Sequence, residues 1–167
     1  MSKSANYAGR IHIYSAPAAL TQHISWAIDQ ALGAVFKLPW QNQPLNPGAM
    51  AMEFDYQDQK SVAAKLALAL KGWHYIRFEI REINKNTQDV IFYRATPELG
   101  LHQVSTASNG DVVLNENQIN AILKNSLTYE KLQVNLENAL GVAWDNELEP
   151  YRLALASGMY QKVSKSG

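Results

Sequence analysis

The sequence has no cysteine and no excess of charge of either sign. Without cysteine the chain can form no disulfide, thiolate zinc site, iron–sulfur cluster or cysteine nucleophile. The 15 Lys and Arg residues balance the 15 Asp and Glu residues. This balance argues against binding to nucleic acid or to an anionic membrane, because both depend on an excess of positive charge. We therefore expect neither nucleic acid nor membrane as a partner.

Long apolar runs are also missing. A secretory signal needs an uninterrupted apolar core of about 7–15 residues behind basic residues, and a membrane-spanning helix needs about 18 apolar residues. The first apolar stretch, 11–20, is interrupted by His12 and Ser15. Since neither kind of segment is found, we expect a cytoplasmic protein.

What remains is a composition typical of one globular domain. The chain has 167 residues, of which 47% are hydrophobic, and a chain of this length buries roughly 70% of its unfolded surface. We expect a single α+β domain over residues 1–160. The polar end of the chain, 161–167, is expected to be a disordered tail.

The first half of the chain switches repeatedly between strand and helix patterns. Alternating apolar residues predict strands over 9–15, 34–40, 49–56 and 73–83, and helical spacing predicts helices over 18–32 and 59–71. The order strand, helix, strand, strand, helix, strand is the split βαβ arrangement of ferredoxin-like folds. Both helices are therefore expected on the same face of one sheet, because the two crossovers should be right-handed.

The second half extends this ferredoxin-like βαββαβ core by a β-hairpin or extra strands and by C-terminal helices. We expect strands over 89–95, 99–106 and 112–114, and a last short helix that ends before Pro150. The residues expected to share one core are Ile11, Ile13, Leu20, Ile24, Leu66, Leu70, Ile76, Phe78 and Ile80.

Catalytic and cofactor motifs are missing. The histidines at positions 12, 23, 74 and 102 have no metal-ligand spacing, so no metal site is expected. The sequence also has no G-x-S-x-G elbow, phosphate-binding loop or dinucleotide fingerprint, so no cofactor is expected. His74 is in phase with the core residues of its strand and is expected at the edge of the core.

The sheet face opposite the two helices is the first candidate site, because charged and aromatic side chains gather on it. The candidates are His12, Tyr14, Glu53, Asp55, Tyr75, Arg77 and Glu79. RNA-recognition domains with this element order stack bases on the same face, but here carboxylates at positions 53 and 55 would repel phosphates. We expect a non-catalytic module that binds a protein partner or a small effector, with a homo-oligomer left open. In the structural alternative, the C-terminal helices pack over this face and bury its charged residues.

The alternative function is a small-molecule enzyme. His12, Tyr14 and one of the carboxylates at positions 53, 55 and 79 would then act as general acid and base. A concave pocket bordered by His12 and a carboxylate would favour the enzyme. A flat exposed patch or a symmetric subunit contact would favour the binding module.

A second candidate lies in the acidic segment 144–150. Asp145 and Glu149 are four residues apart, so both carboxylates lie on one helix face, where they could serve as an acid/base pair if burial separates their pKa values. Because acidic groups near the end of a helix are disfavoured by its dipole, we expect them to meet a basic side chain, Arg152 or the row of Arg77 and Arg81. Trp144 and Leu148 are expected to be buried.

Six strings of the sequence, with His23 and Trp26, together resemble a known family. They are SAPAAL (15–20), AKLALALKGW (64–73), IRFE (76–79), TPELG (96–100), NGDV (109–112) and AWDNELEP (143–150). In this order they resemble the actinobacterial "domain of unknown function 3145" family over nearly the whole chain. The resemblance implies a bacterial cytoplasmic protein of a single-domain family. It implies no activity and no role for any residue.

Overall fold

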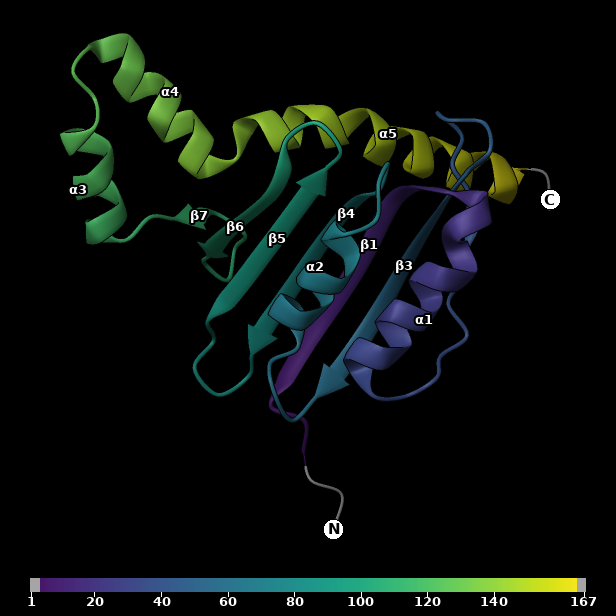
Figure 1. Ribbon diagram of the computed structural model, residues 1–167. Coiled ribbons are helices and arrows are strands. Elements are labelled where there is room, and N and C mark those ends of the chain that lie inside the picture. Colours follow the sequence, from purple (N-terminus) through teal and green to yellow (C-terminus); the bar gives the residue numbers. More distant parts are fainter. Residues whose placement is uncertain (1–3, 165–167) are drawn as a thin grey trace.

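The computed structural model describes residues 4–164, and its strands form one antiparallel sheet (Figure 1). The strands are β1 (Tyr7–Pro17), β2 (Gln41–Asn42), β3 (Ala49–Asp58), β4 (Arg77–Asn84), β5 (Val90–Thr96), β6 (Gly100–Thr106) and β7 (Val112–Val113). Their order across the sheet is β2-β3-β1-β4-β5-β6-β7, and every neighbouring pair is antiparallel. The α+β class is confirmed.

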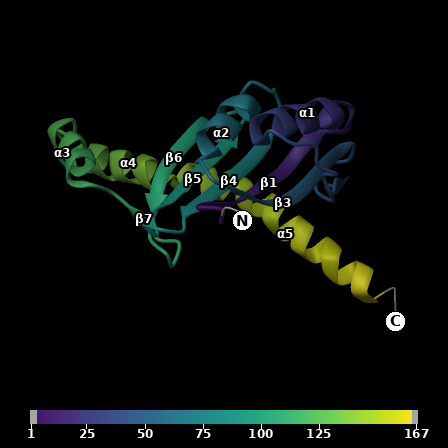
Figure 2. The same cartoon turned by 90° about the horizontal axis from the view of Figure 1, so that it is seen from below.

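The helices are divided between the two faces of the sheet. They are α1 (Thr21–Leu32), which follows the short 3-10 turn η1 (Ala18–Leu20), then α2 (Ala63–Lys71), α3 (Glu116–Lys124), α4 (Tyr129–Leu140) and α5 (Val142–Ser164). Figures 1 and 2 show α1 and α2 side by side on one face, as expected, and α5 crossing the opposite face. The α3–α4 hairpin projects beyond the β7 edge. No helix within 4–164 has both the length and the apolar character needed to cross a bilayer.

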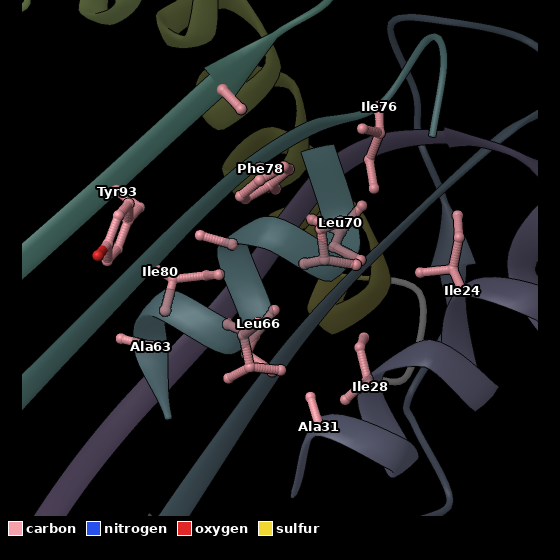
Figure 3. Packing of buried hydrophobic residues seen from close by; sticks show 14 of the residues in the cluster. Ile24, Ile28, Ala31, Ala63, Leu66, Leu70, Ile76, Phe78, Ile80 and Tyr93 are labelled. Carbon is pink, nitrogen blue, oxygen red and sulfur yellow. The ribbon is translucent and has the colours of Figure 1, made fainter. Parts of the chain in front are cut away.

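The main core lies between the sheet and the helices α1 and α2 (Figure 3). All nine expected core residues belong to it, eight of them buried and Leu20 packed at its margin. Burial of such side chains is the main force that stabilises the fold, at about 1.5–3 kcal/mol for each large apolar side chain. The predicted phase of the first and fourth strands is therefore confirmed.

The predicted strand over 34–40 is wrong. Only Gln41 and Asn42 pair with β3, and the segment before them is irregular. Pro39 lacks a backbone N–H for strand pairing. Trp40 instead donates its indole N–H to Ser25 Oγ at 2.9 Å, and Leu38 packs into the core. The apolar alternation thus marks a loop that packs against the core without joining the sheet.

Two other boundaries are later than predicted. The fourth strand begins at Arg77 because Tyr75 has a left-handed backbone conformation, with φ of 64°. His74 is consequently exposed rather than at the edge of the core. Helix α2 begins at Ala63 because the buried Glu82 carboxylate accepts the backbone N–H groups of Val62 and Ala63, at 3.0 and 3.1 Å. This cap comes from β4 and is therefore invisible to local sequence patterns.

The last helix does not end before Pro150. It continues to Ser164, so residues 161–164 of the expected disordered tail are helical, and 165–167 lie outside the described residues. Pro150 is exposed, and so is Asn146, whose carbonyl loses its usual helical donor but is open to water. On the opposite side of the helix Leu148 and Leu155 are buried. Packing against the sheet therefore holds the helix together through the proline.

Candidate functional site

The sheet register arranges the face opposite α1 and α2 in rows, because paired residues of antiparallel strands point to the same side. His12 pairs with Glu79, Glu79 with Arg94, and Arg94 with His102. Helix α5 lies over this row. We call the four residues of the row, together with Tyr14 and Arg77, the covered half. The next rows contain Arg10, Arg81 and Phe92, then Ala8, Ile83 and Val90. We call these six residues the uncovered half.

An apolar contact fixes α5 on the covered half. Leu148 is fully buried and packs with Leu155, Tyr14 and Ala51 in a second, smaller apolar cluster. Tyr151 of α5 packs at the margin of this cluster, and the Arg77 guanidinium lies 4.7 Å from the centre of its ring. The structural alternative, in which a C-terminal helix covers the open face, thus holds for one half of it.

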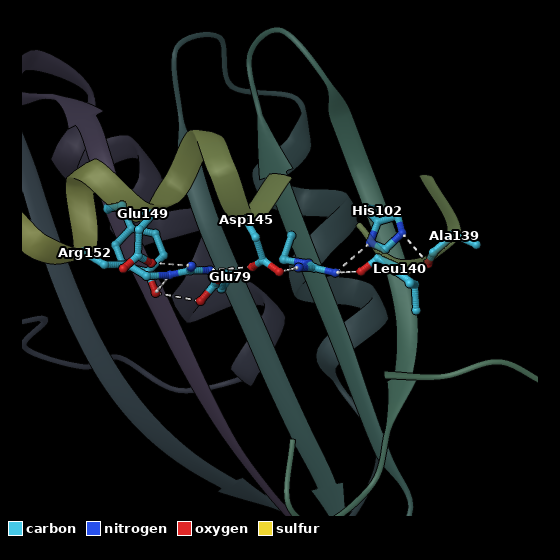
Figure 4. Close-up of polar contacts among 9 residues, drawn as sticks. Glu79, His102, Ala139, Leu140, Asp145, Glu149 and Arg152 are labelled. Atoms are coloured by element: carbon cyan, nitrogen blue, oxygen red, sulfur yellow. Dashed lines mark hydrogen bonds and ion pairs between the residues drawn. The ribbon is translucent and has the colours of Figure 1, made fainter. Parts of the chain in front are cut away.

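The polar contacts under α5 centre on Arg152 (Figure 4). Its guanidinium pairs with Glu79 Oε1 and donates to Glu149 Oε2 at 3.1 Å and to Asp145 Oδ1 at 3.2 Å. The Tyr14 hydroxyl donates to the other oxygen of Glu79 at 2.6 Å. One arginine of α5 thereby gathers three carboxylates from two elements.

Tyr14 and Arg152 stay protonated over the whole pH range in which the protein is expected to fold. Burial and the neighbouring Glu79 carboxylate raise the pKa of Tyr14 above its ordinary value. Burial alone would lower the pKa of Arg152, but the charge of Glu79 and the hydrogen bonds to Tyr14 and Glu79 raise it. Both groups therefore act as fixed hydrogen-bond donors.

Arg94 holds the corner between α4 and α5. Its side chain is almost fully buried, with Nη1 2.8 Å from Asp145 Oδ2 and Nη2 donating to the Leu140 carbonyl at 2.8 Å. His102, whose ring stacks on Trp144 at 4.5 Å, lies 3.4 Å from Nη2. Gly141 is required at the corner, because it has φ of 76° and a Cβ there would lie 2.1 Å from the guanidinium. Arg94 thus connects the sheet to both helices.

All three acids of the segment 144–150 meet a basic side chain. Asp145 pairs with Arg94 and Arg152, Glu149 with Arg152, and Glu147 with Arg77 at 3.3 Å. The predicted pairing is confirmed, although Arg81 takes no part in it. Leu148 is buried as expected, and Trp144 is half-buried, with its indole N–H donating to the Gly100 carbonyl at 3.0 Å.

A groove of about 590 Å³ lies over the uncovered half. Its lining comprises Ala8, Gly9, Arg10, His12, Asp55, Tyr56, Gln57, Glu79, Arg81, Ile83, Val90, Phe92 and Ser108. The floor is mostly apolar, and the charged side chains that line the groove are Arg10, Asp55, Glu79 and Arg81. The groove has a size typical of small-molecule sites, which run from about 300 to 1,000 Å³.

His12 borders the groove on the side of α5. Its ring stacks on Tyr14, with 3.9 Å between ring centres, and Nδ1 lies 3.6 Å from Glu53 Oε2, beyond hydrogen-bond distance. Burial, and then the charges of Arg152 and Arg10, lower the pKa of His12 to about 4. The imidazole is therefore neutral at pH 7.

The other charges around the groove are not equally engaged. Arg10 donates to both oxygens of Asp55, at 2.6 and 3.0 Å, and pairs with Glu53 at 2.9 Å. Arg10 holds the pKa of Asp55 below its usual range through these hydrogen bonds. Arg81 lies directly opposite Arg10 in the register, and within the part of the chain that the structure describes it has no ion pair.

The structure brings most of the sequence-predicted site residues together. His12, Tyr14, Glu53, Asp55, Arg77, Glu79, Asp145 and Glu149 all lie on or above the open face. Tyr75 does not, because it lies in the turn before β4, where it is exposed. Sequence reasoning missed Arg94 and His102. Their signal was the alternation of β5 and β6, which places both side chains on the same face as His12.

The remaining candidates are a metal site and a second groove. Among residues 4–164, no group of three or more His, Asp or Glu side chains is placed to hold a metal ion. A second groove, of about 450 Å³, lies between α1 and α2 and is lined mainly by small residues and Trp73. It contains a single charged side chain, Lys65.

Comparison with known proteins identifies a family. The model of a family described as "Protein of unknown function (DUF3145)" matches residues 10–163. No curated protein and no solved structure matches the chain. The match agrees with the family resemblance of the sequence strings and assigns no role to any residue.

Proposed function

The chain belongs to the DUF3145 family, and we propose that it is a non-catalytic module that binds a small effector in the groove over the uncovered half. The observation that carries this proposal is the contrast between the two halves of one sheet face. Helix α5 closes the covered half, whereas the uncovered half keeps a concave, mostly apolar floor with polar side chains around it. Such a combination is typical of ligand sites.

The engagement of the carboxylates supports binding rather than catalysis. Glu79 accepts hydrogen bonds from Tyr14 and Arg152, and Glu53 and Asp55 are paired with Arg10. A general base needs an oxygen that is free to take a proton from a substrate. Here the two carboxylates that line the groove are already engaged, Asp55 by Arg10 and Glu79 by Arg152 and Tyr14.

One observation favours the enzyme as a second candidate. The groove is concave and is bordered by His12 and a carboxylate, which is the geometry expected of an acid/base site. Because its imidazole is neutral at pH 7, His12 is able to accept a proton. Incubation with a mixture of bacterial metabolites, followed by mass spectrometry, tests this function. A conversion that needs the protein and is lost in His12→Gln would replace the binding module by the enzyme.

Three finer assignments belong to the same proposal. We propose a ferredoxin-like core over 7–84, supported by β3 lying between β1 and β2 and by β1 lying between β3 and β4. We also propose a cytoplasmic location and an actinobacterial source, as the family resemblance implies.

Of the expected partners, a small effector fits the groove better than a protein surface. A homo-oligomer is the alternative, and light scattering on the purified protein distinguishes it from a monomer.

A fluorescent probe tests the proposed site. N-phenyl-1-naphthylamine is neutral and emits strongly in apolar surroundings. We expect it to bind to the wild type and to lose most of its emission with Ala8→Phe, because this substitution places a ring on the groove floor. The matched control is Ala69→Phe, which places the same ring in the groove between α1 and α2. If the control variant loses the emission and Ala8→Phe keeps it, the groove over the uncovered half is not the site.

A further inference from the structure

Two arginines face each other on the floor of the groove. Arg10 of β1 and Arg81 of β4 are direct partners in the antiparallel register, an arrangement that destabilises a sheet when both charges are left uncompensated. Glu53 and Asp55 compensate Arg10. Arg81 has no carboxylate partner within residues 4–164, because Glu79, on the same strand face, is engaged by Arg152 and Tyr14.

Arg81 also has neighbours outside β1 and β4. Its guanidinium lies against the turn between β6 and β7, where a Cβ added to Gly110 would be 3.4 Å from Nη1. Ser108 of the same turn lines the groove. Arg81 pairs in register with Phe92, whose side chain also contributes to the floor. The groove therefore contains an uncompensated cation beside an aromatic ring.

The floor of the groove is short in both directions. From the His12 row to the Ile83 row is four residues along β1 and β4, or about 13 Å, and from β1 to β5 is two strand spacings, or about 10 Å. The apolar part of the floor consists of Phe92, in the row of Arg10 and Arg81, and of Ala8, Ile83 and Val90, in the row beyond it. These dimensions fit one or two fused rings lying against the sheet.

The carboxylates limit the charge of the ligand. Asp55 lies on one side of the groove and Glu79 at its α5 end, so a second negative charge on the ligand would be repelled. A single carboxylate directed at Arg81 avoids this repulsion and matches the two donors of a guanidinium. The neutral ring of His12, at the same end as Glu79, adds no charge requirement.

We propose that the groove binds a flat aromatic monocarboxylate, with its rings on the floor formed by Ala8, Ile83, Val90 and Phe92 and its carboxylate on Arg81. This inference rests on the proposed function of the groove and adds the charge and shape of the ligand. Arg81 is the group that distinguishes the anion from a neutral molecule of the same shape.

Calorimetric titration with 2-naphthoate and its neutral analogue 2-naphthylmethanol tests the inference. We expect the wild type to bind 2-naphthoate at least about tenfold more tightly, the difference that a charged hydrogen bond typically makes. Arg81→Gln should abolish this difference, and Arg81→Lys should retain part of it. Lys65→Gln removes one positive charge from the groove between α1 and α2. It should leave the difference in affinity between the two probes unchanged, and it therefore controls for net charge.

The outcomes separate the inference from the proposed function. If the wild type binds both probes equally and Arg81→Gln changes neither, the ligand is not an anion, yet the groove remains a binding site. If 2-naphthyl phosphate binds more tightly than 2-naphthoate, the limit to one negative charge is wrong. If the wild type binds neither probe at millimolar concentration, both the inference and the proposed function fail.

Discussion

Arg94 and Arg81 point to the same sheet face from neighbouring strands, and the structure gives them opposite environments. Arg94, in the covered half, is buried and contacts Asp145, Leu140 and His102. Arg81, in the uncovered half, is exposed and lines the groove. The difference comes from α5, which lies over Arg94 and leaves Arg81 uncovered. A charged side chain on this face has a structural role where the helix covers it and is available to a ligand where the helix does not.

Replacement of each arginine by methionine should give the largest contrast. Arg94→Met removes one of the two basic partners of Asp145 and the donor to the Leu140 carbonyl at a buried position, so we expect a loss of about 2–4 kcal/mol in unfolding free energy. Arg81→Met should change it by less than about 0.5 kcal/mol, as exposed substitutions usually do. Urea denaturation of both variants measures the contrast. Equal losses would show that α5 does not distinguish the two halves.

Stability should fall as the pH is lowered from about 6.5 to about 4. In this range the unfolded chain protonates His12 while the folded state, in which its pKa is about 4, does not. Because the unfolded state binds the additional proton, stability rises with pH, and the difference amounts to about 2–3 kcal/mol.

Thermal or urea unfolding of His12→Gln at pH 4 and pH 7 measures this contribution. The variant should lose less stability between the two pH values than the wild type. His74→Gln, at an exposed position outside the sheet, serves as the control. A wild-type pH dependence unchanged in His12→Gln would contradict the burial of His12 at the edge of the groove.

Neutralising single carboxylates should give the smallest difference in stability between the two halves, again with the larger loss in the covered half. Glu79→Gln weakens the contacts with Arg152 and Tyr14 under α5 and should cost about 1–2 kcal/mol. Asp55→Asn weakens an exposed pair with Arg10 and should cost less than about 0.5 kcal/mol, because solvent screens such pairs. Denaturation curves of both variants check the order, and a larger loss in Asp55→Asn would reverse the account.

The sequence predicts the core well because burial imposes a simple period on each strand and helix. Ile11, Ile13, Phe78 and Ile80 were placed correctly by alternation alone. The same period misled at 34–40, where Leu38 and Trp40 pack from an irregular loop. Periodicity reports which side chains are buried, and it does not report whether the backbone finds a strand partner.

The sequence placed most of the candidate residues on one sheet face, with Tyr75 wrong and Arg94 and His102 missed, and it did not show how α5 divides that face. Alternation placed His12, Tyr14 and Glu79 on one face, and the dipole argument indicated basic partners for Asp145 and Glu149. Neither argument shows which half of the face is covered, because that depends on α5 continuing through Pro150. The sequence signal for a stop at this proline is local, whereas the burial of Leu148 and Leu155 that overrides it depends on tertiary packing.

The position of a bound ligand tests the central claim most directly, namely that the uncovered half is the binding site. Two-dimensional ¹H–¹⁵N NMR spectra recorded during addition of 2-naphthoate report this position residue by residue. We predict that the largest amide shifts occur at Ala8, Arg10, Arg81, Ile83 and Phe92, which line the groove. Largest shifts at Ala69 and Trp73, between α1 and α2, or in the α3–α4 hairpin would contradict it.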